Sequence, residues 1–120
     1  AQKLGLDTWK LNGCPMDGGG ITIDGSNVIR TTWQRKGMVY FCQPGEPEIY
    51  IGKGRNCNIS GTGNSTVLTF QNNDTVKVIS IKNKNEIAVG EGGFLKSIVL
   101  PDNRILCVWE HGDEIKFKII

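Results

Sequence analysis

The residues with the clearest capacity for chemistry lie near the start of the chain, in the stretch Asn12-Gly-Cys-Pro-Met-Asp-Gly-Gly-Gly20. Asp17 stands among glycines, which allow a backbone to approach a ligand closely. A carboxylate in such a loop could act as a general acid or accept hydrogen bonds from sugar hydroxyls. A turn aspartate that bonds to its own backbone is the structural alternative. We take Asp17 as the candidate catalytic residue and Met16 beside it as a candidate binding residue.

Further candidate binding residues are polar or aromatic. Arg55 could hold a ligand carboxylate through two parallel hydrogen bonds, or it could form an ion pair between neighbouring structural units. Trp9 could stack on a sugar ring. Asn56, Arg35 and Lys96 are expected to lie in neighbouring loops, with their polar side chains available to the same ligand.

Metal and cofactor chemistry are not indicated by the sequence. The four cysteines are Cys14, Cys42, Cys57 and Cys107, and no Cys-x-x-Cys pair occurs among them. His111 is the single histidine, so neither a metal site nor a cofactor is expected. Two disulfides are possible, with Cys14 and Cys57 as candidate neighbours, and buried free thiols are the alternative.

A repeated pattern organises the elements that must position these residues. Trp33, Phe70 and Trp109 each end an alternating, strand-forming run, and they are separated by 37 and 39 residues. The tetrapeptide Ile51-Gly-Lys-Gly54 recurs 38 residues later as Val89-Gly-Glu-Gly92. A fixed period of this size with several short strands in each unit is typical of propeller blades. Trp33 and Trp109 are therefore expected in the core between blades.

The predicted fold is an all-β, single-domain β-propeller segment of about three four-stranded antiparallel blades. Blade one covers 14–52, blade two 57–90 and blade three 94–120, while residues 1–5 are expected to form an outer strand that completes another blade. Strands are expected at 21–23, 28–33, 38–42, 48–51, 57–60, 66–70, 76–81, 86–89, 95–100, 105–109 and 115–120, separated by turn-forming residues.

The predicted blades do not close by themselves. Blade three has no fourth strand of its own, whereas Ala1–Leu4 would be a fourth strand without a blade. An unpaired edge strand favours aggregation, and three blades are too few for a ring. We therefore expect a partner for this chain, either a second copy or a missing half of the propeller.

Propeller geometry also predicts where the site lies. Connections from strand four to the next strand one, and turns from strand two to strand three, gather on one face, and ligands usually bind at such loops. Asp17 and Arg55 are therefore expected on the same face, within reach of one small ligand. The same face should present Asn12, Met16, Asn56, Glu91, Phe94, Lys96, Arg35, Lys36, Gln71 to Asp74, Glu110 and His111.

The overall charge excludes some classes of partner. The 120 residues carry a formal net charge of +2, with acids and bases interspersed. A nucleic-acid or anionic-membrane partner is not indicated by such a balance. We expect a secreted or periplasmic location.

The stretch Thr8-Trp-Lys-Leu-Asn-Gly-Cys-Pro-Met-Asp-Gly-Gly-Gly20, followed by a strand that ends in Thr32-Trp33, resembles the sialidase-like (BNR-repeat) propeller proteins. Two later stretches are similar to the same family, namely Pro47-Glu-Ile-Tyr-Ile-Gly-Lys-Gly-Arg-Asn56 and Leu100-Pro-Asp-Asn-Arg-Ile-Leu-Cys-Val-Trp-Glu110. The resemblance implies the C-terminal half of a six-bladed propeller that acts on glycans or binds them.

Two functions stay open under this resemblance. One is a sialidase-like glycoside hydrolase whose site is shared with blades outside this chain. The other is a non-catalytic glycan-binding or scaffold propeller, which could also form as a dimer of three-bladed chains. The chain has no intact Ser-x-Asp-x-Gly-x-Thr-Trp box of the sialidases and no tyrosine after Tyr50.

Overall fold

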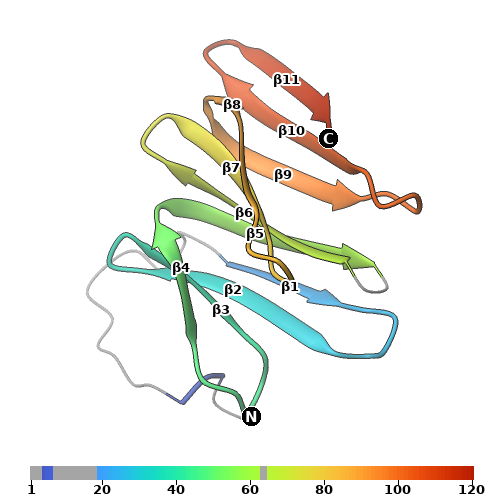
Figure 1. The fold of residues 1–120 in the computed structure, drawn as a ribbon. Helices are drawn as coiled ribbons and strands as arrows, with labels where there is room; N and C mark the ends of the chain where they lie inside the picture. Colours follow the sequence, from blue (N-terminus) through green and yellow to red (C-terminus); the bar gives the residue numbers. More distant parts are fainter. Residues whose placement is uncertain (1–3, 7–18, 63–64) are drawn as a thin grey trace.

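The computed structural model describes residues 4–6, 19–62 and 65–120. These residues contain eleven strands and no helix, so the all-β prediction is confirmed. The strands form three antiparallel sheets that lie one against the next from the N-terminal to the C-terminal part of the chain (Figure 1). No helix that could cross a membrane is present in this part of the chain.

Sheet A contains the first four strands in the order β1-β2-β3-β4. Their bounds are β1 Gly19–Ile23, β2 Ile29–Arg35, β3 Met38–Cys42 and β4 Ile49–Lys53. The β2–β3 turn has positive φ at both Lys36 and Gly37, as a tight hairpin requires. In the β1–β2 turn, Asp24 accepts hydrogen bonds from the amides of Ser26 and Val28 and pairs with Arg30.

Sheet B repeats the same order with β5-β6-β7-β8. Its strands are β5 Arg55–Thr62, β6 Ser65–Asn72, β7 Thr75–Ser80 and β8 Glu86–Glu91. The β6 strand is buried along most of its length, on both faces of the sheet. A continuous buried run of this kind is expected for a strand in a sheet that is covered on both sides.

Sheet C contains three strands among the described residues, in the order β11-β10-β9. They are β9 Gly93–Val99, β10 Ile105–His111 and β11 Glu114–Ile119. In contrast to β6, every residue of β11 is exposed.

Each strand segment expected from the sequence overlaps one of these strands. The segment 38–42 has the bounds of β3, whereas β5 extends two residues beyond each end of 57–60. The register of β5 against β6 shifts between Arg55 and Asn58, so the strand contains an irregularity close to its start.

Two hydrophobic cores fill the spaces between the sheets. Between sheets A and B, Phe41 packs with Leu68, Phe70 and other buried residues. Between sheets B and C, the core includes Val78 and Trp109. Each core is formed by one face of one sheet and the opposite face of the next, so sheet B contributes to both.

The two repeated sequence signals, the aromatic residue and the Gly-x-Gly link, meet in space. A Cβ atom added to Gly90 would lie 2.8 Å from Cζ2 of Trp109, and one added to Gly92 would lie 2.9 Å from its Cδ1. The indole Nε1–H of Trp109 donates a hydrogen bond of 2.9 Å to the carbonyl of Glu91 between these glycines. One sheet earlier, Gly54 packs in the same way on Phe70. The link after one sheet is therefore held by the aromatic residue of the next sheet.

The tryptophans differ in burial. Trp109 is 8% exposed, which confirms its predicted place in the core. Trp33 is only half-buried, because its side of sheet A is the one turned away from sheet B, and the core expectation for it is met only in part.

The N-terminal strand prediction concerns residues of which 1–3 lie outside the described part of the chain. Leu4–Leu6 form a bend, and Gly5 packs against the side chain of Glu48. The exchange of Ala1–Leu4 between blades remains a prediction.

Candidate functional site at the turn edge

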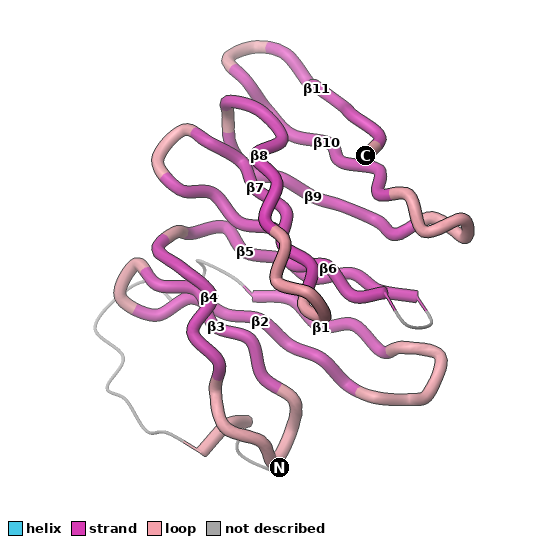
Figure 2. Tube along the Cα trace, in the orientation of Figure 1, coloured by secondary structure: helices cyan, strands magenta, loops and turns pink. Residues whose placement is uncertain are grey.

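The connections expected to form a binding face lie together at one edge of the sheets, which we call the turn edge. It comprises the β2–β3, β6–β7 and β10–β11 turns and the β4–β5 and β8–β9 links. Figure 2 shows the three turns in pink, one after another along the left side of the view. The amide of Gly54 donates to the Gly37 carbonyl at 2.9 Å, and the amide of Gly92 donates to that of Asp74 at 2.7 Å. Each link is thus tied to the turn of the preceding sheet.

The first cleft at the turn edge lies between sheets A and B and has a volume of about 540 Å³. Its exposed charged side chains are Lys53 and Arg55 on one side and Asp74 on the other. The full lining comprises Gly37, Lys53, Gly54, Arg55, Gln71, Asn72, Asn73 and Asp74. Two cations beside backbone amides and amide side chains could accept an anionic, hydroxyl-bearing group.

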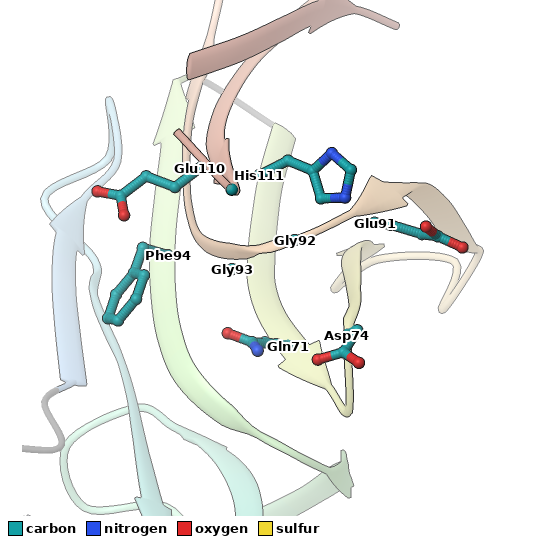
Figure 3. A pocket seen from close by; sticks show the side chains of 9 residues that line it. Gln71, Asp74, Glu91, Gly92, Gly93, Phe94, Glu110 and His111 are labelled. Atoms are coloured by element: carbon teal, nitrogen blue, oxygen red, sulfur yellow. The ribbon is translucent and has the colours of Figure 1, made fainter. Parts of the chain in front are cut away.

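The second cleft lies between sheets B and C and has a volume of about 390 Å³. Its lining comprises Gln71, Asp74, Glu91, Gly92, Gly93, Phe94, Glu110, His111 and Gly112. In Figure 3, the side chains of Glu110 and Phe94 project toward one end of this cleft, and Glu91 lies at the other end. The cleft therefore combines carboxylates, an imidazole and an aromatic ring, a set suited to hydroxyl groups and to the apolar face of a sugar.

Phe94 has a backbone conformation that is unusual for a bulky residue. Its φ is 56°, and its side chain is 59% exposed. A left-handed conformation costs a non-glycine residue about 1–2 kcal/mol, and an exposed ring recovers little of that through packing. At the matching place in sheet B, two residues after the link glycine, Asn56 has a φ of 51°. Asparagine adopts this conformation more readily, so the phenylalanine is the position that requires an explanation.

Gln71 forms the wall between the two clefts. It is 5% exposed, accepts a hydrogen bond from Asn56 Nδ2 at 3.0 Å and donates one to the Asn73 carbonyl at 2.8 Å. One sheet earlier, Gln34 accepts a hydrogen bond from the Asn56 amide at 2.9 Å. The sequence holds a signal for these residues, because Gln34, Gln71 and Glu110 each follow the repeated aromatic residue.

Two of the predicted binding residues lie at the first cleft. Arg55 lines it with an exposed side chain, and among the described residues it forms no ion pair. Asn56 is half-buried beside it; its backbone amide donates to Gln34 of sheet A, and its side chain donates to Gln71 within sheet B. The predicted residues Asp17, Met16 and Trp9 lie outside the described residues, so the expected pairing of Asp17 with Arg55 stays a prediction.

The other two predicted binding residues lie away from the clefts. Lys96 pairs with Val108 on the side of sheet C that faces away from sheet B. The guanidinium of Arg35 lies 4.4 Å from the centre of the Tyr40 ring and 3.2 Å from a carboxylate oxygen of Glu48. The Glu48 side chain is only 2% exposed, so this is a buried charge pair. No local sequence pattern indicates this pair, because its two members lie on different strand segments.

A hollow of about 420 Å³ at the opposite edge of the sheets includes Asp24, Arg30 and Lys82. The hydrogen bond from Arg30 lowers the pKa of Asp24, because it stabilises the ionised carboxylate. Asp24 and Arg30 thus pair with one another inside this hollow.

Within the described ranges, no group of three His, Cys, Asp or Glu side chains could hold a metal ion. The three described cysteines, at positions 42, 57 and 107, are buried free thiols, the second of the two alternatives considered for them. Burial raises the pKa of all three thiols, since it disfavours the thiolate. They are thus parts of the core rather than reactive groups.

Comparisons of the chain with protein families, with curated proteins and with solved structures found no match. The resemblance to sialidase-like propellers rests on the quoted sequence stretches alone.

Proposed function

We propose that the chain is a segment of a β-propeller that binds glycans at its turn edge. The observation that carries this proposal is the repetition of one arrangement. The first strands of the sheets, β1, β5 and β9, are neighbours in series, and clefts form where each link meets the turn of the preceding sheet. Adjacent first strands and face-to-face sheets are what propeller blades require.

The second cleft supports a glycan as the ligand. Sugars present hydroxyl groups at their edges and an apolar C–H face, and they are held by carboxylates or amides together with an aromatic ring. The cleft offers Asp74, Glu91 and Glu110 for hydroxyl groups, and the exposed ring of Phe94 for the apolar face. A ligand-stacking role gives a reason for the strained backbone at Phe94, because strain of this kind gathers at functional sites.

The first cleft extends the same proposal to acidic sugars. Arg55 and Lys53 would bind a carboxylate or sulfate, while Asn72 and Asn73 would bind hydroxyl groups. Binding without catalysis is the function we favour, with a sialidase-like hydrolase as the alternative. Hydrolysis by the common route needs a positioned pair of carboxyl groups. Asp17, the candidate acid, is outside the described residues.

A glycan array followed by titration calorimetry tests this proposal. The informative variant is Phe94→Gly, because glycine removes the ring and also adopts the left-handed backbone without strain. We expect at least about a tenfold loss of affinity for the glycan that the wild type binds, as for the loss of one stacking ring. Thermal unfolding should show that the variant remains folded.

Ile87→Ala is the matched control, since Ile87 is an exposed apolar residue of β8 that lines neither cleft. It should bind the glycan as the wild type does. Equal binding by Phe94→Gly and wild type would show that the second cleft is not the site. Release of a free sugar during the titration would favour the hydrolase instead.

A further inference from the structure

The sheets of this chain present two kinds of face, and each kind recurs at matching positions. The strand pairs Thr32 with Phe41, Thr69 with Val78 and Val108 with Phe117 occupy the same place in sheets A, B and C. In sheets A and B, this face packs on the following sheet. The opposite face, with the repeated aromatic residue, packs on the preceding sheet.

Sheet C keeps the apolar character of the first kind of face, but no further sheet packs on it within 4–6, 19–62 and 65–120. Phe41 is 4% exposed and Val78 2%, whereas Phe117 is 73% exposed. The next register position behaves in the same way, because Val39 and Val76 are fully buried and Ile115 is 68% exposed. We call this surface the outer face of sheet C. Its exposed apolar residues are Ile98, Val108, Ile115, Phe117 and Ile119, and Lys96 lies on the same face beside Val108.

Sheet A presents the second kind of face with no preceding sheet among the described residues. Its exposed or half-buried members are Ile21, Ile23, Trp33, Tyr40 and Tyr50, which we call the outer face of sheet A. The rings of Trp33 and Tyr40 stack with their centres 6.5 Å apart, and the Tyr50 ring meets Tyr40 edge-on at 5.9 Å. The matching aromatic residues of the later sheets, Phe70 and Trp109, are buried under a neighbouring sheet.

The charges at the turn edge agree with a contact between these two faces. On sheet A, the exposed charges of this edge include Lys36 and Lys53. On sheet C, they include Glu110 and Asp113. Bringing the outer face of sheet C onto the outer face of sheet A would set the acidic turn beside the basic one, and complementary charges favour such an encounter.

We propose that a second copy of this chain covers these surfaces, with the outer face of sheet C in each copy packed on the outer face of sheet A in the other. A second copy suits these faces because the chain already makes this kind of sheet contact twice, between sheets A and B and between sheets B and C. Each contact joins two different faces, and two such contacts related by a two-fold axis close a ring of six sheets. Six lies within the four to eight blades of known propellers.

The second copy would also complete a further cleft of the kind found at the turn edge. Such a cleft would lie between Glu110 and Asp113 of one chain and the partner's Lys36. The inference rests on the propeller part of the proposed function and not on glycan binding. Its test therefore measures mass in the absence of any glycan.

The test is sedimentation equilibrium or light scattering of the 120-residue chain. We expect twice the mass of one chain for the wild type. Phe117→Glu and Ile23→Glu each place a charge on one of the two outer faces, and each should yield monomers, with association weakened at least about thirtyfold. Both side chains are exposed in the single chain, so the circular dichroism spectrum should not change. The control is Lys118→Glu, a change at the exposed residue next to Phe117, which should leave the dimer intact.

An equimolar mixture of the two disrupting variants gives the sharpest result. The unaltered sheet A of Phe117→Glu can still receive the unaltered sheet C of Ile23→Glu, so the mixture should re-associate into pairs while each variant alone does not. A monomeric wild type would overturn the proposal and indicate that another segment or partner covers these faces. A dimer broken by Phe117→Glu but not by Ile23→Glu would overturn it in favour of contact between like faces.

Discussion

Replacement of Trp109 tests how the links and the repeated aromatic residues hold the sheets together. The side chain is 8% exposed, lies over Gly90 and Gly92, and donates a hydrogen bond to the Glu91 carbonyl. Truncation to alanine removes the buried ring and leaves a cavity, which costs about 3–5 kcal/mol. We therefore expect Trp109→Ala to lower the free energy of unfolding by that amount.

Trp109→Phe separates the ring from the hydrogen bond. Phenylalanine already occupies the matching position, at Phe70, against the previous link. The variant loses one hydrogen bond, about 1 kcal/mol, and part of the buried ring area, so we expect a loss of about 1–2 kcal/mol in all.

The assay is urea unfolding followed by far-ultraviolet circular dichroism, which does not depend on tryptophan emission. Trp33→Ala serves as a comparison, since Trp33 is only half-buried within one chain. At concentrations where the chain is monomeric, this comparison variant should lose less stability than Trp109→Ala. An unchanged midpoint for Trp109→Ala, or equal losses for the alanine and phenylalanine variants, would show that the Trp109 ring does not hold the link between sheets B and C.

Further predictions concern charges and thiols. Since the hydrogen bond from Arg30 holds the folded pKa of Asp24 below 3.8, the stabilisation it gives is complete above that value and is lost as the pH falls through the folded value. The advantage of wild type over Asp24→Asn in urea midpoint should therefore shrink as the pH is lowered below 3.8, and an advantage that stays constant in this range would contradict this. Glu48→Gln removes the buried carboxylate that pairs with the Arg35 guanidinium, so thermal unfolding should reveal a loss of about 3–5 kcal/mol, and a loss below about 1 kcal/mol would show the pair to be dispensable. The three buried thiols should resist a thiol reagent at neutral pH until urea unfolds the chain, whereas fast labelling of any of them in the folded protein would show that it is accessible.

The sequence predicted the strands well because their signals are local. Alternation between apolar and polar residues sets the faces of a strand, and turn residues mark its ends, as in Met38–Cys42. The Gly-x-Gly links and the aromatic residues were visible as repeats for a physical reason, since bare glycines give the aromatic rings room to pack. Gln71 could have been found by the same repeat, because it follows the aromatic residue at position 70.

The candidate site could be predicted only in outline. The gathering of links and turns at one edge followed from topology, and Arg55 lies there as expected. Arg35 instead pairs with Glu48, away from the clefts. This pair depends on a contact across the sheet that no local sequence pattern encodes. The left-handed backbone at Phe94 is likewise invisible in the sequence, because phenylalanine normally avoids that conformation.

A crystal structure of the 120-residue chain tests most directly which sheet faces pack on one another. We predict that the outer face of sheet C in one copy lies on the outer face of sheet A in another, with six sheets around one axis and every cleft at the same end. A structure in which like faces pair, or in which β1, β5 and β9 are no longer neighbours, would contradict the propeller arrangement.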